Sequence, residues 1–248
     1  MSHSTGREMK AMIFAAGLGT RLGELTKKTP KALVDINGKS ALRIAVEKLT
    51  AEGFDDIIVN IHHHPDSMLS EIHHLCDEGF RISVSDESAE LLDTGGGLFN
   101  ARHFFGSEPF LVYNVDIFSD INLKALYDAH LSSDAIATLA VRHRNGNRML
   151  VVDKKGRLMG WCNNATKEEI LTVENKKGLE QIAFTGIHVV SPAIFNLMQE
   201  GIYSMTSLYL MLAGSHKINT FLYDDGYWFD CGTPENLGKI RKQLSIIN

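Results

Sequence analysis

The chain has 248 residues, of which 30 are acidic and 25 basic, and its formal net charge is −5. This balance excludes the basic surface typical of nucleic-acid binding, so any phosphate recognition must be local. Its three cysteines fit neither a disulfide framework nor zinc spacing, and no apolar run approaches the roughly 18 residues of a membrane helix. We expect one cytoplasmic domain, residues 1–248, with a disordered tail at residues 1–9 and no nucleic-acid or membrane partner.

The first expected element is a buried strand, residues 11–14, which leads directly into a glycine-rich loop. Gly17 and Gly19 would let main-chain N–H groups approach an anion closely. Arg21 and Lys31 then add positive charge. A simple turn between a strand and a helix would explain the glycines but not the two cations, so the stretch predicts a phosphate site.

A dinucleotide site is the main alternative, because the fingerprint G-x-G-x-x-G also follows a first strand. Here Leu22 occupies the third glycine position. The following residues, 24–30, are typical of a loop and leave no room for a cofactor helix. A nicotinamide dehydrogenase is therefore disfavoured.

Strands and helices alternate along the rest of the chain. The expected helices are 41–52 with Ser40 as cap, one beginning at Pro65, 98–104, 122–131, 192–200, 207–213 and one beginning at Pro234. The expected strands are 56–61, 81–85, 109–113, 135–141, 149–153, 157–161, 182–190 and 217–223. This alternation predicts a Rossmann-like, three-layer α/β/α fold with a mainly parallel central sheet and a small β elaboration on the substrate side.

The cluster His62-His63-His64 suggests a metal site, but adjacent residues of a strand alternate faces and cannot all reach one ion. The other interpretation is a loop before the helix that begins at Pro65. Whether one of these histidines contacts a substrate is left open.

Several later positions are candidates for ligand contact. Gly95 and Gly96 belong to a run of three glycines expected to form a loop before the helix 98–104, either as a close-approach loop or as a flexible turn. Asp116 follows a core strand, where a carboxylate can hold a hard cation. Arg148 belongs to a basic cluster that either binds phosphate or is a solvated loop. Gly186 interrupts a strand, which indicates a ligand or a bulge.

The run Gly17-Leu18-Gly19-Thr20-Arg21 with Pro30-Lys31 resembles the G-x-G-[ST]-R…P-K signature of the sugar-1-phosphate nucleotidylyltransferases. The resemblance extends from about Lys10 to the last helix. It is strongest for the short N-acetylmuramate 1-phosphate uridylyltransferase and mannose-1-phosphate guanylyltransferase branch. It implies a transferase of nucleotide-sugar biosynthesis that supplies cell-wall or polysaccharide precursors.

The resemblance also implies roles for individual residues. Asp230, in a segment similar to the family's Trp-x-Asp-x-Gly-Thr, would join Asp116 as a ligand of Mg²⁺, and these two with Arg21 and Lys31 would be catalytic. Substrate contacts would be Asn114, Arg148 and Gly186. The nucleotide would be bound by Ala16, Gly17, Gly19, Thr20, Arg21, Lys31, Gly95 and Gly96. Val115 departs from the family's usual glycine, and Glu174-Asn175-Lys176 only partly matches its Glu-Lys-Pro motif, so that role is not assigned.

A sugar 1-phosphate is already an oxyanion, so its in-line attack on the α-phosphate of an NTP needs positioning and charge stabilisation rather than a nucleophilic side chain. The products would be an NDP-sugar and pyrophosphate. The best candidate pairs are UTP with N-acetylmuramate 1-phosphate and GTP with mannose 1-phosphate. The alternatives are a phosphocholine cytidylyltransferase-like enzyme and a non-catalytic nucleotide-sugar sensor. The sequence specifies neither the base, nor the acceptor, nor the oligomeric state.

Overall fold

The structure is a computed structural model that describes residues 9–26 and 29–247. Its strands are β1 (Lys10–Phe14), β2 (Asp35–Ile36), β3 (Lys39–Ser40), β4 (Asp56–Ile61), β5 (Arg81–Asp86), β6 (Phe110–Asn114), β7 (Ile117–Ser119), β8 (Ala137–Arg142), β9 (Arg148–Val152), β10 (Leu158–Asn163), β11 (Glu168–Leu171), β12 (Glu180–Val190), β13 (Ile218–Leu222) and β14 (Trp228–Asp230).

Six α-helices and four 3-10 helices connect the strands of the described residues. The α-helices are α1 (Ala41–Ala51), α2 (Pro65–Asp77), α3 (Asp93–Asn100), α4 (Leu123–Leu131), α5 (Met205–Leu212) and α6 (Pro234–Ile247). The 3-10 helices are η1 (Thr20–Thr26), η2 (Lys31–Leu33), η3 (Ala101–Phe104) and η4 (Pro192–Leu197).

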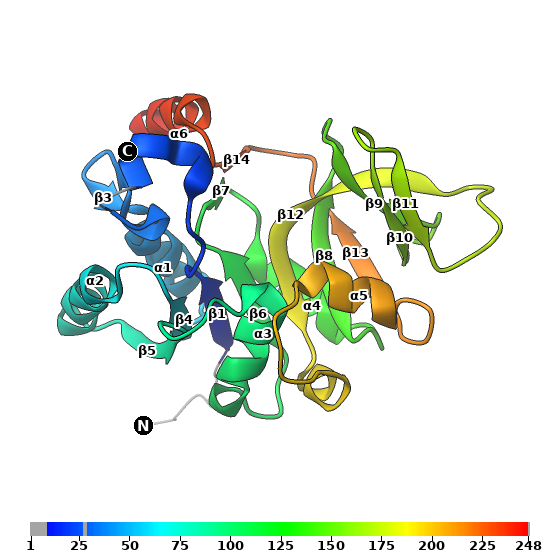
Figure 1. Cartoon of the computed structure of the whole chain (residues 1–248), viewed down its shortest axis with the longest axis horizontal. Coiled ribbons are helices and arrows are strands. Elements are labelled where there is room, and N and C mark those ends of the chain that lie inside the picture. Colours follow the sequence, from blue (N-terminus) through cyan, green and yellow to red (C-terminus); the bar gives the residue numbers. More distant parts are fainter. Residues whose placement is uncertain (1–8, 27–28, 248) are drawn as a thin grey trace, which may run out of the picture.

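The central sheet has the strand order β5-β4-β1-β6-β12-β8-β13 (Figure 1). Strands β5, β4, β1 and β6 are parallel to one another, and β13 is parallel to β8. Only β12 runs antiparallel to its neighbours β6 and β8. Helices cover both faces, so the predicted three-layer α/β/α fold with a mainly parallel sheet is confirmed.

Strand β12 also begins a second, antiparallel sheet. Its first residues, 180–182, pair with β9, and β10 and β11 follow in antiparallel order. The register of β12 against β8 shifts between Phe184 and His188, where Gly186 has a φ of 85°. The predicted interruption at Gly186 is therefore present as a bulge, and the extension β9–β11 matches the predicted β elaboration.

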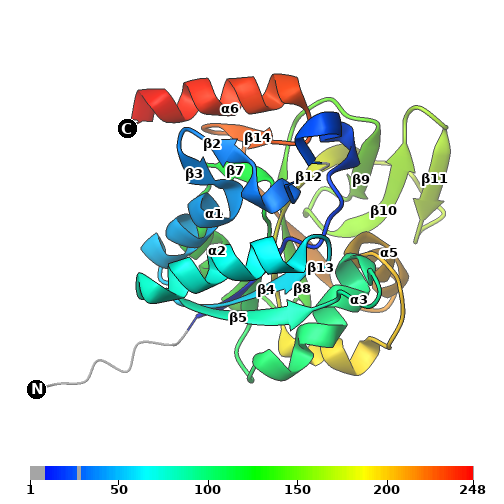
Figure 2. The same cartoon turned by 60° about the vertical axis from the view of Figure 1, so that its left-hand side comes forward.

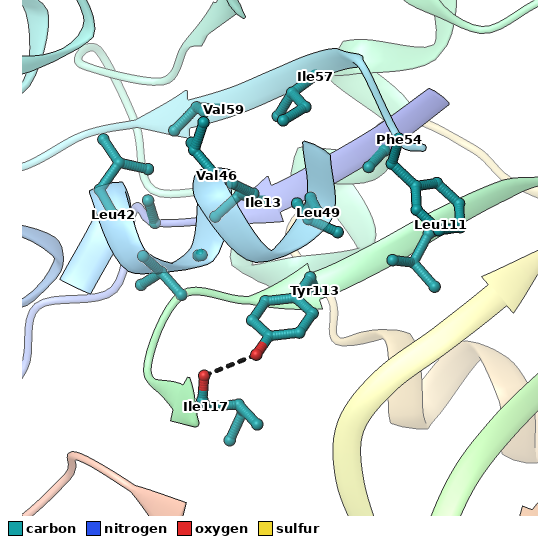
Figure 3. Close-up of a cluster of buried hydrophobic side chains, with 14 of the residues drawn as sticks. Ile13, Leu42, Val46, Leu49, Phe54, Ile57, Val59, Leu111, Tyr113 and Ile117 are labelled. Carbon is teal, nitrogen blue, oxygen red and sulfur yellow. Dashed lines mark hydrogen bonds between the residues drawn. The ribbon is translucent and has the colours of Figure 1, made fainter. Parts of the chain in front are cut away.

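The core divides into two clusters because successive residues of a strand point to opposite faces of the sheet. Ile13 of β1 packs with residues of α1, α2 and α4, whereas its neighbour Met12 packs with residues of α3 and α5. Figure 3 shows the first cluster, in which the Tyr113 hydroxyl donates to the carbonyl oxygen of Ile117 at 2.8 Å. This hydrogen bond satisfies a buried hydroxyl and fixes the chain just after Asp116.

The last helix, α6, lies across the end of the fold above β2 and β14 (Figure 2). Thr233 caps it as predicted, since the Thr233 hydroxyl accepts from the N–H of Asn236 at 3.2 Å. A guanidinium nitrogen of Arg241 donates to the carbonyl oxygen of Asp35 at 2.7 Å. The helix thus holds β14 and its Asp230 against the rest of the molecule.

Three expected elements differ from the structure. The helix expected at 192–200 is instead the 3-10 helix η4, which ends at Leu197. The helix expected at 98–104 begins instead at Asp93, so the three glycines lie inside α3 and not in a loop. Their lack of side chains serves packing: a Cβ atom on Gly95 would lie 2.7 Å from the main-chain oxygen of Tyr203. The first residues of the loop expected at 24–30 belong instead to η1, which continues to Thr26 after a break at Gly23.

The expected tail, residues 1–9, lies outside the described residues except for Met9, which packs against the first core cluster. Residues 27–28 of the expected loop also lie outside them.

Candidate active site

The carboxyl ends of β1 and β6 lie side by side, with Phe14 and Asn114 in register. The N–H of Val115 donates to the carbonyl oxygen of Phe14 at 3.1 Å, which holds the two following loops together. A cavity of about 450 Å³, called the first cavity, opens at this edge of the sheet. It is lined by Ala16, Gly17, Lys31, Asn114 and Asp116, among others. Ligands of open α/β sheets bind at this kind of position.

Lys31 and Asp116 form an ion pair at the first cavity, and their side chains are only 12% and 19% exposed. Lys31 reaches this position because the glycine loop passes very close to it. A Cβ atom on Gly19, where φ is 64°, would lie 2.9 Å from the Cβ atom of Lys31. Gly19 therefore brings the loop and the cation together.

Asp230 is held beside Asp116 by the short ladder between β14 and β7. Asp230 pairs with Ile117, and the N–H of Cys231 donates to the carbonyl oxygen of Asp116 at 2.9 Å. One carboxylate oxygen of Asp230 accepts from the N–H of Gly232 at 3.0 Å. The two predicted carboxylates thus come from directly bonded segments that lie far apart in the sequence.

Arg21 lies on the Asp230 side of this arrangement. A Cβ atom on Gly232 would lie 2.7 Å from a guanidinium nitrogen of Arg21 and 2.6 Å from a carboxylate oxygen of Asp230. Arg21 and its neighbour Thr20 are exposed and do not line the first cavity.

The predicted substrate residues Asn114 and Gly186 are in contact. A Cβ atom on Gly186 would lie 2.8 Å from the side-chain nitrogen of Asn114. The bulge in β12 therefore leaves room for the Asn114 carboxamide at the cavity.

Other predicted residues lie elsewhere. Gly95 and Gly96 are buried within α3 and do not line the first cavity, whereas Asp93 and Thr94 at the start of that helix do. Arg148 lines a different cavity of about 570 Å³, called the second cavity. Asp93 lines both cavities, so the two are neighbours.

Asn60 and Glu87 are site residues that sequence reasoning missed. The side-chain oxygen of Asn60 accepts from the N–H groups of Ala15 and Ala16 at 2.7 and 3.4 Å, and its nitrogen donates to Glu87 at 2.7 Å. Burial raises the pKa of Glu87, which is 3% exposed. A polar residue between the apolar residues of strand β4 was the available signal.

Across residues 9–26 and 29–247, no group of three or more His, Cys, Asp or Glu side chains is arranged to hold a metal ion. His62 bonds through its Nδ1 atom to the carbonyl oxygen of Glu87 at 2.7 Å, and His64 precedes α2 with a φ of 53°. Asp116 and Asp230 offer two carboxylates. That number fits Mg²⁺, which proteins commonly bind through one or two carboxylates together with substrate phosphates.

A glycine loop, a lysine and two carboxylates at the carboxyl edge of an open sheet define a nucleotide-binding α/β enzyme. Residues 10–245 match the sequence profile described as nucleotidyl transferase, and the chain belongs to this family. The family predicted from the glycine loop and Lys31 is therefore confirmed.

Curated relatives cover most of the chain. The N-acetylmuramate alpha-1-phosphate uridylyltransferase of Caulobacter vibrioides is 26% identical to it, and the alignment covers 91% of this chain and 92% of the relative. The N-acetylmuramate alpha-1-phosphate uridylyltransferase of Neisseria meningitidis is 29% identical, over 91% of this chain and 94% of the relative. A probable mannose-1-phosphate guanylyltransferase 2 of Arabidopsis thaliana is 28% identical over 92% of this chain and 63% of its own length.

Solved structures share the fold. The crystal structure of HddC from Yersinia pseudotuberculosis has a TM-score of 0.78 and 22% identity, covering 95% of this chain and 99% of HddC. A UDP-glucose pyrophosphorylase complexed with UDP-glucose has a TM-score of 0.74 and 18% identity, covering 97% of this chain and all of the other. In the part of the chain that the structure describes, no helix is both long and apolar enough to cross a membrane.

Proposed function

We propose that the chain transfers a nucleotidyl group from an NTP to a sugar 1-phosphate and releases pyrophosphate. The observation that carries the proposal is the ion pair of Lys31 with Asp116 beside the glycine loop, with Asp230 held next to Asp116 by the pairing of β14 with β7. The curated relatives named as uridylyl- and guanylyltransferases of sugar 1-phosphates support it. A non-catalytic sensor would have no need of both carboxylates and the lysine at one place.

In this proposal the loop residues Ala16, Gly17 and Gly19 face the phosphates of the NTP through their main chain. Arg21, with Thr20 beside it, holds the leaving pyrophosphate, and Lys31 neutralises the reacting phosphates. Catalysis then consists of bringing two anions together in line at the α-phosphorus and stabilising the charge that develops there.

Asp116 and Asp230 would hold a divalent cation, which we propose to be Mg²⁺. Such an ion, when bound, supplies Lewis-acid charge neutralisation between the two phosphates. The ion pair with Lys31 and the hydrogen bond from Gly232 keep these carboxylates oriented toward the same edge of the sheet. Two carboxylates leave room for phosphate oxygens in the coordination sphere.

The acceptor is proposed to lie over Asn114 and Gly186 and to extend toward Arg148 in the second cavity. Gly95 and Gly96 would affect nucleotide binding indirectly, because their close packing sets the position of the first residues of α3. The candidate pairs are UTP with N-acetylmuramate 1-phosphate and GTP with mannose 1-phosphate, and the choline phosphate acceptor is the alternative. Because β12 belongs to both sheets, we propose that the chain works as one domain.

The test is pyrophosphate release with Mg²⁺ for UTP, GTP, CTP, dTTP and ATP, each against N-acetylmuramate, N-acetylglucosamine, mannose and glucose 1-phosphates and phosphocholine. We expect at least one sugar 1-phosphate to be used, and its NDP-sugar to appear in equal amount. Nucleotide binding without turnover of any acceptor would instead support the sensor.

A further inference from the structure

The second cavity lies between α5 and the β9–β11 extension. Its charged side chains include Arg144 and Arg148, and its aromatic side chains are Trp161 and Phe184. Because it shares Asp93 with the first cavity, a ligand whose phosphate reacts at the first cavity can extend into the second.

Arg144 lies between the reaction site and the second cavity. Its guanidinium stacks 4.4 Å from the centre of the Trp228 ring, two residues before Asp230, and donates to the carbonyl oxygen of Phe184 at 3.3 Å. Burial lowers the pKa of Arg144. Arg144 is therefore placed to face the phosphate end of an acceptor.

Arg148 faces the same cavity from the first position of β9. Its side chain forms neither a hydrogen bond nor an ion pair with the residues that the structure describes. A planar guanidinium with free donors on a cavity wall is suited to bind a carboxylate in a bidentate manner.

The cavity also contains two carboxylates, and neither pairs with an arginine. Asp93 accepts from the N–H of Thr94 at 2.6 Å at the junction with the first cavity. Glu168 is the exposed first residue of the edge strand β11. Arg148 thus keeps its donors for a ligand, while Trp161 and Phe184 provide apolar surface for a sugar ring.

We infer that the acceptor is an acidic sugar 1-phosphate, with a carboxylate substituent that Arg148 binds in the second cavity while Arg144 faces its phosphate. This inference rests on the proposed function and refines it. Among the candidates it selects the N-acetylmuramate class over neutral mannose or glucose 1-phosphates. It also excludes phosphocholine, whose distal group is a cation.

The test compares kcat/KM for three acceptors with the productive NTP: N-acetylmuramate 1-phosphate, its lactyl carboxamide, and N-acetylglucosamine 1-phosphate. The carboxamide keeps the shape and removes the charge. The variants are Arg148→Gln, Arg148→Lys and the control Lys155→Gln, which removes one positive charge from the exposed turn between β9 and β10.

We expect the wild type to prefer the carboxylate over the carboxamide by about tenfold or more, the range of a charge-assisted hydrogen bond. Arg148→Gln should lose this ratio, Arg148→Lys should retain part of it, and Lys155→Gln should retain it fully. Equal use of the carboxylate and the carboxamide by the wild type, or an unchanged ratio in Arg148→Gln, overturns the inference and leaves the proposed function standing. Absence of turnover with every NTP and acceptor overturns both.

Discussion

The main-chain N–H of Cys231 donates a 2.9 Å hydrogen bond to the carbonyl oxygen of Asp116. This bond joins the loop after β6 to the end of β14 and so places the carboxylates of Asp116 and Asp230 at one edge of the sheet. The main chain, rather than a direct contact between the two side chains, sets their relative position.

We therefore expect Asp116→Asn and Asp230→Asn to fold normally and to lose about 10²–10³-fold in kcat, as when one preorganised charge-stabilising group is removed. Pyrophosphate release and thermal unfolding measure the two properties. Asp225→Asn, in the exposed loop just before β14, is the matched control and should retain activity. Near-normal turnover of either site variant would remove the proposed metal role.

The contact of Gly186 with Asn114 predicts a substitution that damages both stability and activity. Gly186→Ala places a Cβ atom 2.8 Å from the Asn114 side chain, at a residue whose φ is 85°. The close contact and the unfavourable φ should together lower the free energy of unfolding by about 1–3 kcal/mol and displace the carboxamide. Urea unfolding and kcat/KM measure these effects. Gly238→Ala, in the open face of α6, should be neutral or stabilising by up to about 1 kcal/mol. Equal behaviour of the two variants would contradict the packing argument.

The two glycine segments should respond differently to alanine. Gly17 has no atom within 4 Å of an added Cβ, so Gly17→Ala should leave thermal stability unchanged and weaken NTP binding by obstructing the phosphates. Gly96→Ala would overlap the carbonyl oxygen of Gly201 and should destabilise the fold by about 1–3 kcal/mol. Calorimetric binding of NTP and thermal unfolding separate the two effects, and loss of stability in Gly17→Ala would count against the loop assignment.

The buried His188 makes the free energy of unfolding depend on pH. Burial lowers the pKa of His188 to about 3, and both its ring nitrogens lack a hydrogen-bond partner among the described residues. Between about pH 6.5 and 3 the unfolded chain binds a proton that the folded chain excludes, so stability falls as pH falls. His188→Phe should flatten this dependence by up to about 1.4 kcal/mol per pH unit, measured by urea unfolding at pH 4.5 to 7.5. The same pH slope in both proteins would show that His188 does not contribute.

Much of the fold was predictable because local signals agree with the tertiary structure. Strand β4 has the predicted bounds, since its apolar run is bordered by polar residues. Helix α1 begins after Ser40, whose hydroxyl accepts from the N–H of Arg43 at 3.0 Å, as a cap should. The start of α3 was predicted wrongly because glycines usually indicate a loop, whereas here contact with residues 201–203 requires them in a helix.

The candidate site was predictable where a side chain follows a strand directly, as Asp116 does. Asn60 and Glu87 were missed because their roles depend on a contact between separate strand ends, which no local pattern reveals. The position of Arg144 over Trp228 depends likewise on how the loop after β8 lies against β14 in space.

The spacing of two residues along strand β12 limits which acceptors the site can use. Phe184 on the second cavity and Gly186 beneath Asn114 are two residues apart on this strand, a span of at most about 7 Å. Two of the proposed acceptor contacts, the apolar surface at Phe184 and the Asn114 carboxamide over Gly186, would therefore be positioned by one continuous piece of main chain. We expect the site to select acceptors by length as well as by charge, because the separation of its two contact points is set covalently.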